Sequence, residues 1–394
     1  MTSILSRQFE KVLVRTKIYP IFRPSAVNIP VQLSFADQFG FVPTGSTTSA
    51  LISILDCVTK MLCSHAYVRV IALDLSKAFD SIRHSTLLDK IAQLPIPDNV
   101  YNWLVDFFQN RSHCTKMRGH ISGMEFINAS VVQGSAVGPA AFSIASSDLH
   151  PVVKGNEMRK YADDGYIIVP ASNCSTSQTE VDNVTNWAGR NNLKINSNKS
   201  LEMIFRRPRS KILEDSIPTL VHIKRVQEMK ILGFTVTNDL KVQAHVKQTL
   251  SSCSQSLYAL RILKSHGLNG AALQQVYHAI TLSKLLYGVS AWWGFASSEE
   301  ILRIEAFLRK SKKCFFCSNT IDSVSSLVDV ADRRLFHQIC SNPDHVLHSL
   351  LPPLNKHQYS LRHRNHNRMM PKIVTNDLYL HKNCITRMLL SDSY

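Results

Sequence analysis

The chain has 394 residues, 44% hydrophobic and 19% charged, which is typical of a globular protein long enough for two or three domains. Lys and Arg outnumber Asp and Glu by 45 to 29, and the net charge of +16 suggests a polyanionic partner such as nucleic acid, the alternative being simply a basic protein. No apolar run is long enough to span a membrane, and the nine scattered cysteines suit reduced thiols in an intracellular protein, nuclear or cytoplasmic. The oligomeric state stays open.

The first half of the chain alternates helical and strand patterns. Residues 1–66 are expected to be mostly helical, interrupted by a loop over 37–50. Ser46 to Thr48 could cap the helix over 49–62 that follows. A mostly buried strand follows and ends near Asp74. Helices at 84–94 and 98–111, short strands near 114–130 and a glycine-containing loop that runs into a helix at 131–149 come next. Residues 158–170, "MRKYADDGYIIVP", predict a tight hairpin with Asp163 and Asp164 at its tip.

The second half becomes more helical. A helix at 180–192, a strand at 200–208 and the segment "KILGFTV" at 230–236 lead to long helices from about residue 240. Apolar residues there recur every three or four positions, and another helix is expected from Asn269 to about Trp292. The last hundred residues mix helical patches with a basic, histidine-rich tail.

Three aspartates stand at predicted strand ends: Asp74, Asp163 and Asp164. Carboxylates that are brought together repel one another unless a cation lies between them. Mg²⁺ prefers a few carboxylates together with substrate phosphates, and two such ions could activate a 3′ hydroxyl and stabilise leaving pyrophosphate. Alone, Asp-Asp-Gly is more simply explained as a turn sequence.

Five motifs, however, follow one another in a defined order. They are "ALDLSKAFDSI", "VVQGSAVGPAAF", "KYADDGYIIV", "NNLKINSNKSLEMIF" and "KILGFTV", and together they resemble the palm of reverse transcriptases, most closely those of non-LTR (LINE-type) retrotransposons. The resemblance implies an α+β fold, a right-hand polymerase palm with an antiparallel sheet and helices. It also implies partial fingers at 1–66, a palm at 67–238, a helical thumb at 239–296 and a helical, basic region at 297–394.

The resemblance also implies roles for single residues. Asp74, Asp163 and Asp164 would hold two Mg²⁺ ions, with Mn²⁺ as an expected substitute, and Lys199 could donate a proton to leaving pyrophosphate. Phe79 would exclude a ribose 2′ hydroxyl by its bulk. The other substrate contacts would come from Leu75, Gln133, Gly134, Tyr161, Leu232 and Gly233, the last two in a primer-grip hairpin. Without the family, Phe79 would be an ordinary core residue and Lys199 could equally be a solvated surface lysine.

The implied function is RNA-directed DNA synthesis, with an RNA template, a DNA primer and dNTPs as partners and no membrane. Val42 stands where the family usually has Arg, and the chain begins inside the family's first finger segment. An N-terminally truncated, inactive relic that still binds RNA is therefore the alternative. A metal-dependent nuclease is less favoured, because no general base for water is evident.

Weaker signals lie outside these motifs. Cys314 and Cys317 with His337 and Cys340 imitate a zinc site, although helical periodicity favours helix-face residues. Basic residues at 205–211, Arg362, Arg364 and Arg368 could contact phosphates or form a solvated charge run. Trp292 and Trp293 could stack on bases, but core packing is the favoured interpretation.

Overall fold

The structure is a computed structural model that describes residues 33–207, 216–318, 320–354, 367–370 and 379–391. The chain forms two compact units that interleave along the sequence. The first unit comprises Met1–Gly45, Ala72–Ile167 and Ser175–Ser200, and the second comprises Ser46–Ile71, Ile168–Cys174 and Leu201–Tyr394. The division into four consecutive segments stays a prediction, and residues 1–32 of the expected fingers lie outside the described residues.

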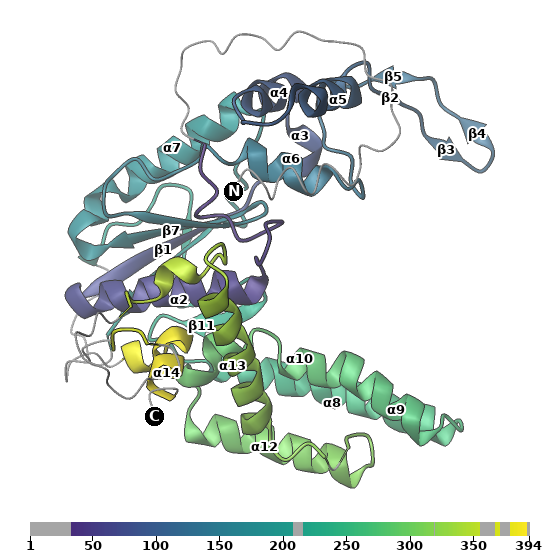
Figure 1. Ribbon diagram of the computed structural model, residues 1–394, viewed down its shortest axis with the longest axis vertical. Helices are drawn as coiled ribbons and strands as arrows, with labels where there is room; N and C mark the ends of the chain where they lie inside the picture. Colours follow the sequence, from purple (N-terminus) through teal and green to yellow (C-terminus); the bar gives the residue numbers. More distant parts are fainter. Residues whose placement is uncertain (1–32, 208–215, 319, 355–366, 371–378, 392–394) are drawn as a thin grey trace. The chain divides into compact units, whose positions relative to one another are not determined.

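One five-stranded sheet has the strand order β6-β7-β1-β8-β9. Strands β6 and β7 are joined by a two-residue turn, so they run antiparallel, whereas β8 and β9 pair in parallel. This sheet with its helices has the α+β, palm-type architecture expected from the sequence (Figure 1). The strand bounds are Tyr67–Leu73 for β1, Glu157–Tyr161 for β6, Asp164–Pro170 for β7, Leu201–Arg206 for β8 and Lys224–Arg225 for β9.

Strand β1 is buried on both faces. Val68, Val70 and Ile71 are all inaccessible to solvent, and even Arg69 is only 2% exposed. The Arg69 guanidinium lies 3.4 Å from the carboxylate of Glu202 on β8, which is also 2.8 Å from Arg225. A buried charge is tolerated when it is paired and hydrogen-bonded, so this cluster allows an arginine inside a strand that is otherwise apolar.

Helices of the first unit bury the apolar positions that the sequence pattern identified. Leu87 and Ile91 on α4 and Leu104 on α5 are almost completely buried, and α4 packs against both α5 and α6. Short strands β2 to β5 form two small hairpin ladders between Ser112 and Phe126, which extend away from α5 (Figure 1). The helices are α3 Ala78–Ser81, α4 His84–Ala92, α5 Asp98–Phe108, α6 Gly138–Ala145 and α7 Ser177–Arg190.

In the second unit, helix α2 (Thr47–Ser64) begins where its cap was predicted. The Ser46 side chain accepts a hydrogen bond from the Ser49 amide at 3.0 Å. The segment "KILGFTV" forms the expected hairpin from β10 (Glu228–Ile231) and β11 (Phe234–Thr237). Local capping and turn chemistry therefore specify both features.

The long helices expected after residue 240 are present in part. Helix α8 (Gln243–Ser265) is continuous, but the single helix expected from Asn269 to Trp292 is wrong. This stretch divides into α9 (Gly270–Val276), a π-helical turn, α10 (Ser283–Leu285) and α11 (Val289–Trp292). Gly288 has a φ of 60° and ends the helical path before α11, a conformation that glycine adopts at little cost.

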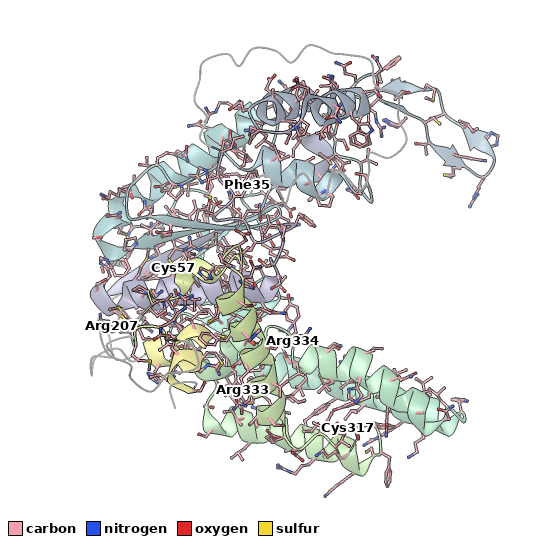
Figure 2. All side chains as sticks on the ribbon, viewed as in Figure 1. Phe35, Cys57, Arg207, Cys317, Arg333 and Arg334 are labelled. Atoms are coloured by element: carbon pink, nitrogen blue, oxygen red, sulfur yellow. The ribbon has the colours of Figure 1, made fainter. Side chains whose placement is uncertain are left out.

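The C-terminal part of the second unit consists of helices. They are α12 Ser298–Lys313, α13 Val324–Ser341 and α14 Cys384–Ser391. Figure 2 shows Arg333 and Arg334 on α13 and Cys317 beyond the end of α12. The nine cysteines all lie within the described ranges, and none of them forms a disulfide bond. Within the described ranges, no helix is both long and apolar enough to cross a bilayer.

Candidate active site

Three carboxylates meet in the first unit at neighbouring strand ends. Asp74 directly follows β1, Asp163 lies in the turn between β6 and β7, and Asp164 is the first residue of β7. Because β1 and β7 are neighbours in the sheet, these side chains approach one another although about ninety residues separate them in the chain.

The electrostatics show how closely the carboxylates interact. Burial, together with the charges of Asp163 and Asp74, raises the pKa of Asp164 to about 6. Burial also raises the pKa of Asp163, where a backbone hydrogen bond opposes the shift and the charge of Asp74 adds to it. Half-buried carboxylates that repel one another are a site that a cation would stabilise.

The donor set suits a hard divalent cation. Among the side chains that the structure describes, no group of three or more His, Cys, Asp or Glu forms a ready-made metal cage, either at this site or at the cysteine pairs considered for zinc. Mg²⁺ usually keeps waters and binds through one or two carboxylates together with substrate phosphates. An open set of carboxylates therefore fits Mg²⁺ better than it fits a closed structural site.

The loop after α7 holds the backbone of Asp74. The Asn196 amide donates to the Asp74 carbonyl at 2.8 Å, and the Asp74 amide donates to the Ser200 hydroxyl at 3.2 Å. Leu75 pairs with Ile195 in an isolated bridge. These contacts bring the backbone of Lys199 near Asp74, and the Lys199 side chain is exposed.

Phe79 lies on α3, five residues after Asp74. Its ring stacks on Phe142 with a centroid distance of 4.6 Å and meets the edge of Phe41 at 6.1 Å. Phe142 is buried, whereas Phe79 is only half-buried. A ring that is supported on one side and partly exposed could contact a nucleotide, and its role in sugar selection stays a prediction.

The loop before α6 lies against α3. The Val131 amide donates to the Phe79 carbonyl at 2.7 Å, and the exposed Gln133 side chain donates to Asp80 at 3.0 Å. Gly134 has a φ of 82°, and an added Cβ there would meet no atom within 4 Å. Backbone conformation therefore accounts for this glycine, and its approach to a nucleotide stays a prediction.

The remaining predicted contacts lie at two hairpin turns. Tyr161 is half-buried and directly precedes the turn that carries Asp163. In the second unit, Leu232 and Gly233 form the turn between β10 and β11, with φ values of 45° and 84°. The Tyr287 hydroxyl donates to the Leu232 carbonyl at 2.8 Å.

The structure adds little support for the weaker predictions of base stacking and phosphate contact. Trp292 is 2% exposed, which agrees with core packing rather than base stacking. Arg362, Arg364 and residues 208–211 lie outside the described residues. The guanidinium of Arg368 donates to the Pro352 carbonyl at 3.0 Å.

Sequence reasoning missed the residues that support the turn of Ala162 and Asp163 between β6 and β7. Gln38, Gly40 and Lys160 all contact one another or the turn at Ala162. Gln38 and Ala162 are 124 positions apart, and no local pattern relates two residues at that distance. The glycine in "QFGF" was the single available signal, since a glycine within a buried segment often marks close backbone approach.

Solved structures that the chain partly matches include telomerases. A Candida Tropicalis telomerase, solved in complex with a TWJ fragment of telomeric RNA, matches 86% of this chain and 53% of its own, with 12% identity and a TM-score of 0.44. A likeness this distant carries no argument about function.

Curated relatives include proteins of mobile elements in Drosophila melanogaster. The probable RNA-directed DNA polymerase from transposon BS is 25% identical over 70% of this chain and 32% of its own length. The polymerase from mobile element jockey is 25% identical over 70% of this chain and 31% of its own, and that from transposon X-element is 26% identical over 78% and 34%. The chain thus spans about a third of the length of these relatives.

The family described as reverse transcriptase (RNA-dependent DNA polymerase) matches residues 1–236 of the 394. This range contains all five motifs, and the relatives confirm the resemblance to reverse transcriptases of non-LTR elements. The chain therefore belongs to the reverse transcriptase family.

Proposed function

We propose that this chain catalyses RNA-directed DNA synthesis, in which the 3′ hydroxyl of a primer attacks the α-phosphate of a dNTP. The observation that carries the proposal is the convergence of Asp74, Asp163 and Asp164 within a chain of the reverse transcriptase family. RNA template, DNA primer and dNTP are the proposed partners, and the net charge of +16 supports binding to their phosphates.

The carboxylates Asp74, Asp163 and Asp164 would hold Mg²⁺, or Mn²⁺ in its place. When bound, such ions supply Lewis-acid activation of the 3′ hydroxyl and charge stabilisation at the departing pyrophosphate. The chain itself would position the substrates. Lys199 would offer a proton to pyrophosphate, and Leu75, Gln133 and Gly134 would lie along the nucleotide.

Sugar selection is assigned to Phe79. Its stacking on the buried Phe142 restricts the ring, so a 2′ hydroxyl on the incoming nucleotide would meet a side chain that cannot easily move. The primer end is assigned to Tyr161 and to the turn of Leu232 and Gly233. Phe79→Ala should therefore reduce discrimination between dTTP and UTP, whereas unchanged selectivity would make Phe79 a core residue alone.

The direct test is synthesis on poly(rA)/oligo(dT) with dTTP and either Mg²⁺ or Mn²⁺. Wild type should extend the primer, and Asp163→Asn should not, because a neutral amide is a poor ligand for Mg²⁺. Both proteins should bind primed RNA with an affinity that falls steeply with salt, because phosphate contacts release counterions. Equal nucleotide incorporation by wild type and Asp163→Asn would show that the activity comes from a contaminating enzyme. Failure of both to bind at low salt would refute the polymerase and the RNA-binding alternative together.

A further inference from the structure

Residues Asp37 to Gly40 lie along the outer edge of β6. Gln38 pairs with Lys160 in a parallel bridge. The Lys160 amide donates to the Asp37 carbonyl at 2.7 Å, and the Phe39 amide donates to the Lys160 carbonyl at 2.8 Å. The segment therefore covers the outer side of the hairpin formed by β6, Ala162, Asp163 and β7, which we call the acidic hairpin.

The Gln38 side chain contacts the turn of the acidic hairpin. Its Oε1 accepts hydrogen bonds from the Ala162 amide at 3.2 Å and the Gly40 amide at 2.9 Å, while its Nε2 donates to the Ser146 hydroxyl at 3.4 Å. The residue is 2% exposed. A buried carboxamide with both ends occupied holds one orientation, because rotating it would leave polar atoms unpaired.

The Ala162 amide needs such a partner. Ala162 is the first residue of a two-residue turn and has a φ of 56°. In such a turn the hydrogen bond that closes the hairpin uses the flanking residues, so the amide of the first turn residue has no partner within the hairpin. Gln38 supplies the acceptor that the Ala162 amide lacks within the hairpin. Asp163 directly follows Ala162 in the chain, so this hydrogen bond lies next to the carboxylate.

Gly40 also limits where the turn can lie. A Cβ on Gly40 would fall 2.3 Å from the Ala162 nitrogen and 3.0 Å from the Tyr161 carbonyl carbon. The two backbones are therefore in direct contact without an intervening side chain. The turn is held on one side by the Gly40 backbone and by the Gln38 carboxamide.

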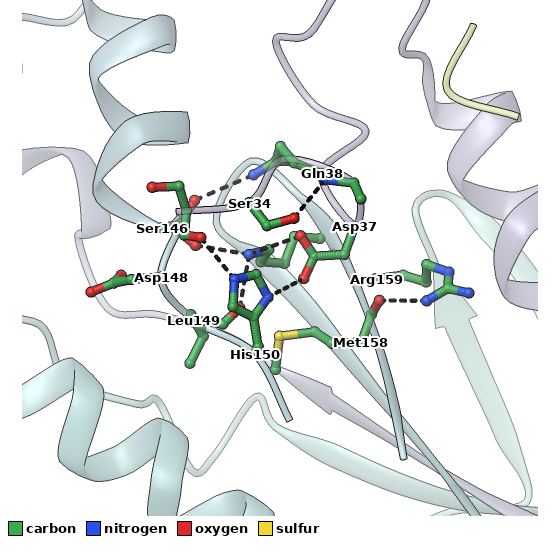
Figure 3. Close-up of polar contacts among 12 residues, drawn as sticks. Ser34, Asp37, Gln38, Ser146, Asp148, Leu149, His150, Met158 and Arg159 are labelled. Atoms are coloured by element: carbon green, nitrogen blue, oxygen red, sulfur yellow. Dashed lines mark hydrogen bonds and ion pairs between the residues drawn. The ribbon is translucent and has the colours of Figure 1, made fainter. Parts of the chain in front are cut away.

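Charged groups hold the base of the same segment, as Figure 3 shows. The Lys160 ammonium lies 3.1 Å from Asp37 Oδ1 and donates to the carbonyls of Ser146 and Leu149 at 2.8 and 2.9 Å. Asp37 Oδ2 also lies 3.2 Å from His150 Nδ1. Lys160 is 3% exposed, so removing Asp37 would leave a buried cation without its counter-charge.

We propose that Gln38 is a positioning residue of the carboxylate site: through its hydrogen bond to Ala162 it sets the turn that carries Asp163. This proposal rests on the proposed function. It identifies Gln38, which lies outside the five motifs, as a residue on which DNA synthesis depends. Gln38 touches no reacting atom. It acts through the backbone, where displacement of a catalytic group by about 1 Å can cost about a hundredfold in rate.

The test compares three variants. Gln38→Met keeps the length of the side chain and removes the acceptor. Gln38→Glu keeps an acceptor oxygen for both amides, and because burial favours the protonated carboxyl group, its hydroxyl can donate to Ser146 in place of Nε2. Gln93→Met alters an exposed glutamine at the end of α4 in the same unit and serves as the control.

With primed RNA and dTTP, Gln38→Met should lower kcat about ten- to hundredfold. Its KM for dTTP and its affinity for primed RNA should change less than about threefold, because no substrate contact is removed. Gln38→Glu should recover most of the rate, and Gln93→Met should equal wild type. Loss of rate in Gln38→Glu equal to that in Gln38→Met, or a wild-type rate in Gln38→Met, would overturn the proposal.

Hydrogen exchange at the Ala162 amide, followed by NMR on alanine-labelled protein, separates this proposal from the proposed function. Exchange should accelerate in Gln38→Met and stay slow in Gln38→Glu and the control. If wild type makes no DNA, the proposed function fails while slow, acceptor-dependent exchange still supports the role of Gln38 in holding the turn. Equal exchange in all variants overturns that role whatever the activity.

Discussion

Two hairpins of this protein both turn over two residues, but the surroundings of the two turns differ. The acidic hairpin of the first unit turns at Ala162 and Asp163, and the β10–β11 hairpin of the second unit turns at Leu232 and Gly233. Each turn is contacted by a residue that is distant in sequence, Gln38 in the first case and Tyr287 in the second. Gln38 is buried at 2% exposure, whereas Tyr287 is 39% exposed.

The difference concerns how much each turn can move. The Gly40 backbone contacts the backbone of the acidic hairpin's turn, and the buried Gln38 carboxamide accepts a hydrogen bond from the Ala162 amide. The other turn meets the ring of one half-exposed tyrosine, which can rotate into solvent. Carboxylates that share a cation need fixed relative positions. A hairpin that is proposed to contact the primer end can tolerate more movement. Four experiments test whether the two turns differ in this way.

The largest effect is expected from adding a methyl group to each glycine. Gly40→Ala places a Cβ 2.3 Å from the Ala162 nitrogen, so it should cost about 1–3 kcal/mol of folding free energy and about a hundredfold in synthesis. Gly233→Ala meets only the Tyr287 ring at 3.1 Å and a φ of 84°, so synthesis should fall less than about tenfold. Urea unfolding and primer extension measure both, and equal losses in synthesis would contradict the comparison.

The second effect is acid sensitivity near the β10–β11 hairpin. His245 packs edge-on against Phe234 of β11 at 5.0 Å and Trp292 at 5.2 Å, and burial lowers the pKa of His245 to about 4. The folded state therefore disfavours protonation, so stability is full above pH 6.5 and declines as the pH falls towards 4, by about 3 kcal/mol at most.

Urea unfolding followed through tryptophan fluorescence between pH 4 and 8 should show this decline in wild type. His245→Phe removes the titrating group and should flatten the dependence. A variant with the same slope as wild type would mean that other groups cause it.

The third effect has the opposite sign and belongs to the acidic hairpin. The folded-state pKa of Asp164, about 6, lies above its ordinary value of 3.8. In metal-free protein its contribution to stability is therefore full below pH 3.8 and is lost as the pH rises through 6. At pH 8 without metal, Asp164→Asn should be more stable than wild type by about 1–2 kcal/mol after allowance for solvent screening.

Thermal unfolding in EDTA measures this gain, with the exposed Asp106→Asn as the matched control. The advantage should disappear near pH 4, and added Mg²⁺ should stabilise wild type more than Asp164→Asn. A gain of equal size in the control, or at pH 4, would remove the link to the carboxylate cluster.

The smallest effect is expected from Tyr287→Phe. This change removes the 2.8 Å hydrogen bond to the Leu232 carbonyl at a partly exposed site, which should cost less than about 1 kcal/mol. Primer extension should fall less than about threefold, far below the loss expected from Gln38→Met. A loss as large as that of Gln38→Met would show that the β10–β11 turn is held as strictly as the acidic turn.

Much of the local structure was predictable because its causes are local. The Ser46 cap begins α2 as expected, the largely apolar run before Asp74 predicts the buried strand β1, and the strand residues on both sides of Asp163 predict the acidic hairpin. Capping, periodicity and turn preference act over a few neighbouring residues, so one sequence is enough to read them. The order of five motifs likewise identified the reverse transcriptase family, which the family match confirms.

Contacts between distant segments could not be predicted from the sequence and depend on the folded structure. The sheet places β7 beside β1, which brings the charge of Asp74 to Asp163 and Asp164, and the 37–40 segment reaches Ala162 across more than a hundred residues. Gly288 interrupts the single helix that apolar periodicity predicted between Asn269 and Trp292. Arg69 can be buried because Glu202 pairs with it. These features depend on strand register and on the burial of paired polar groups, which are set by the whole fold rather than by neighbours in the chain.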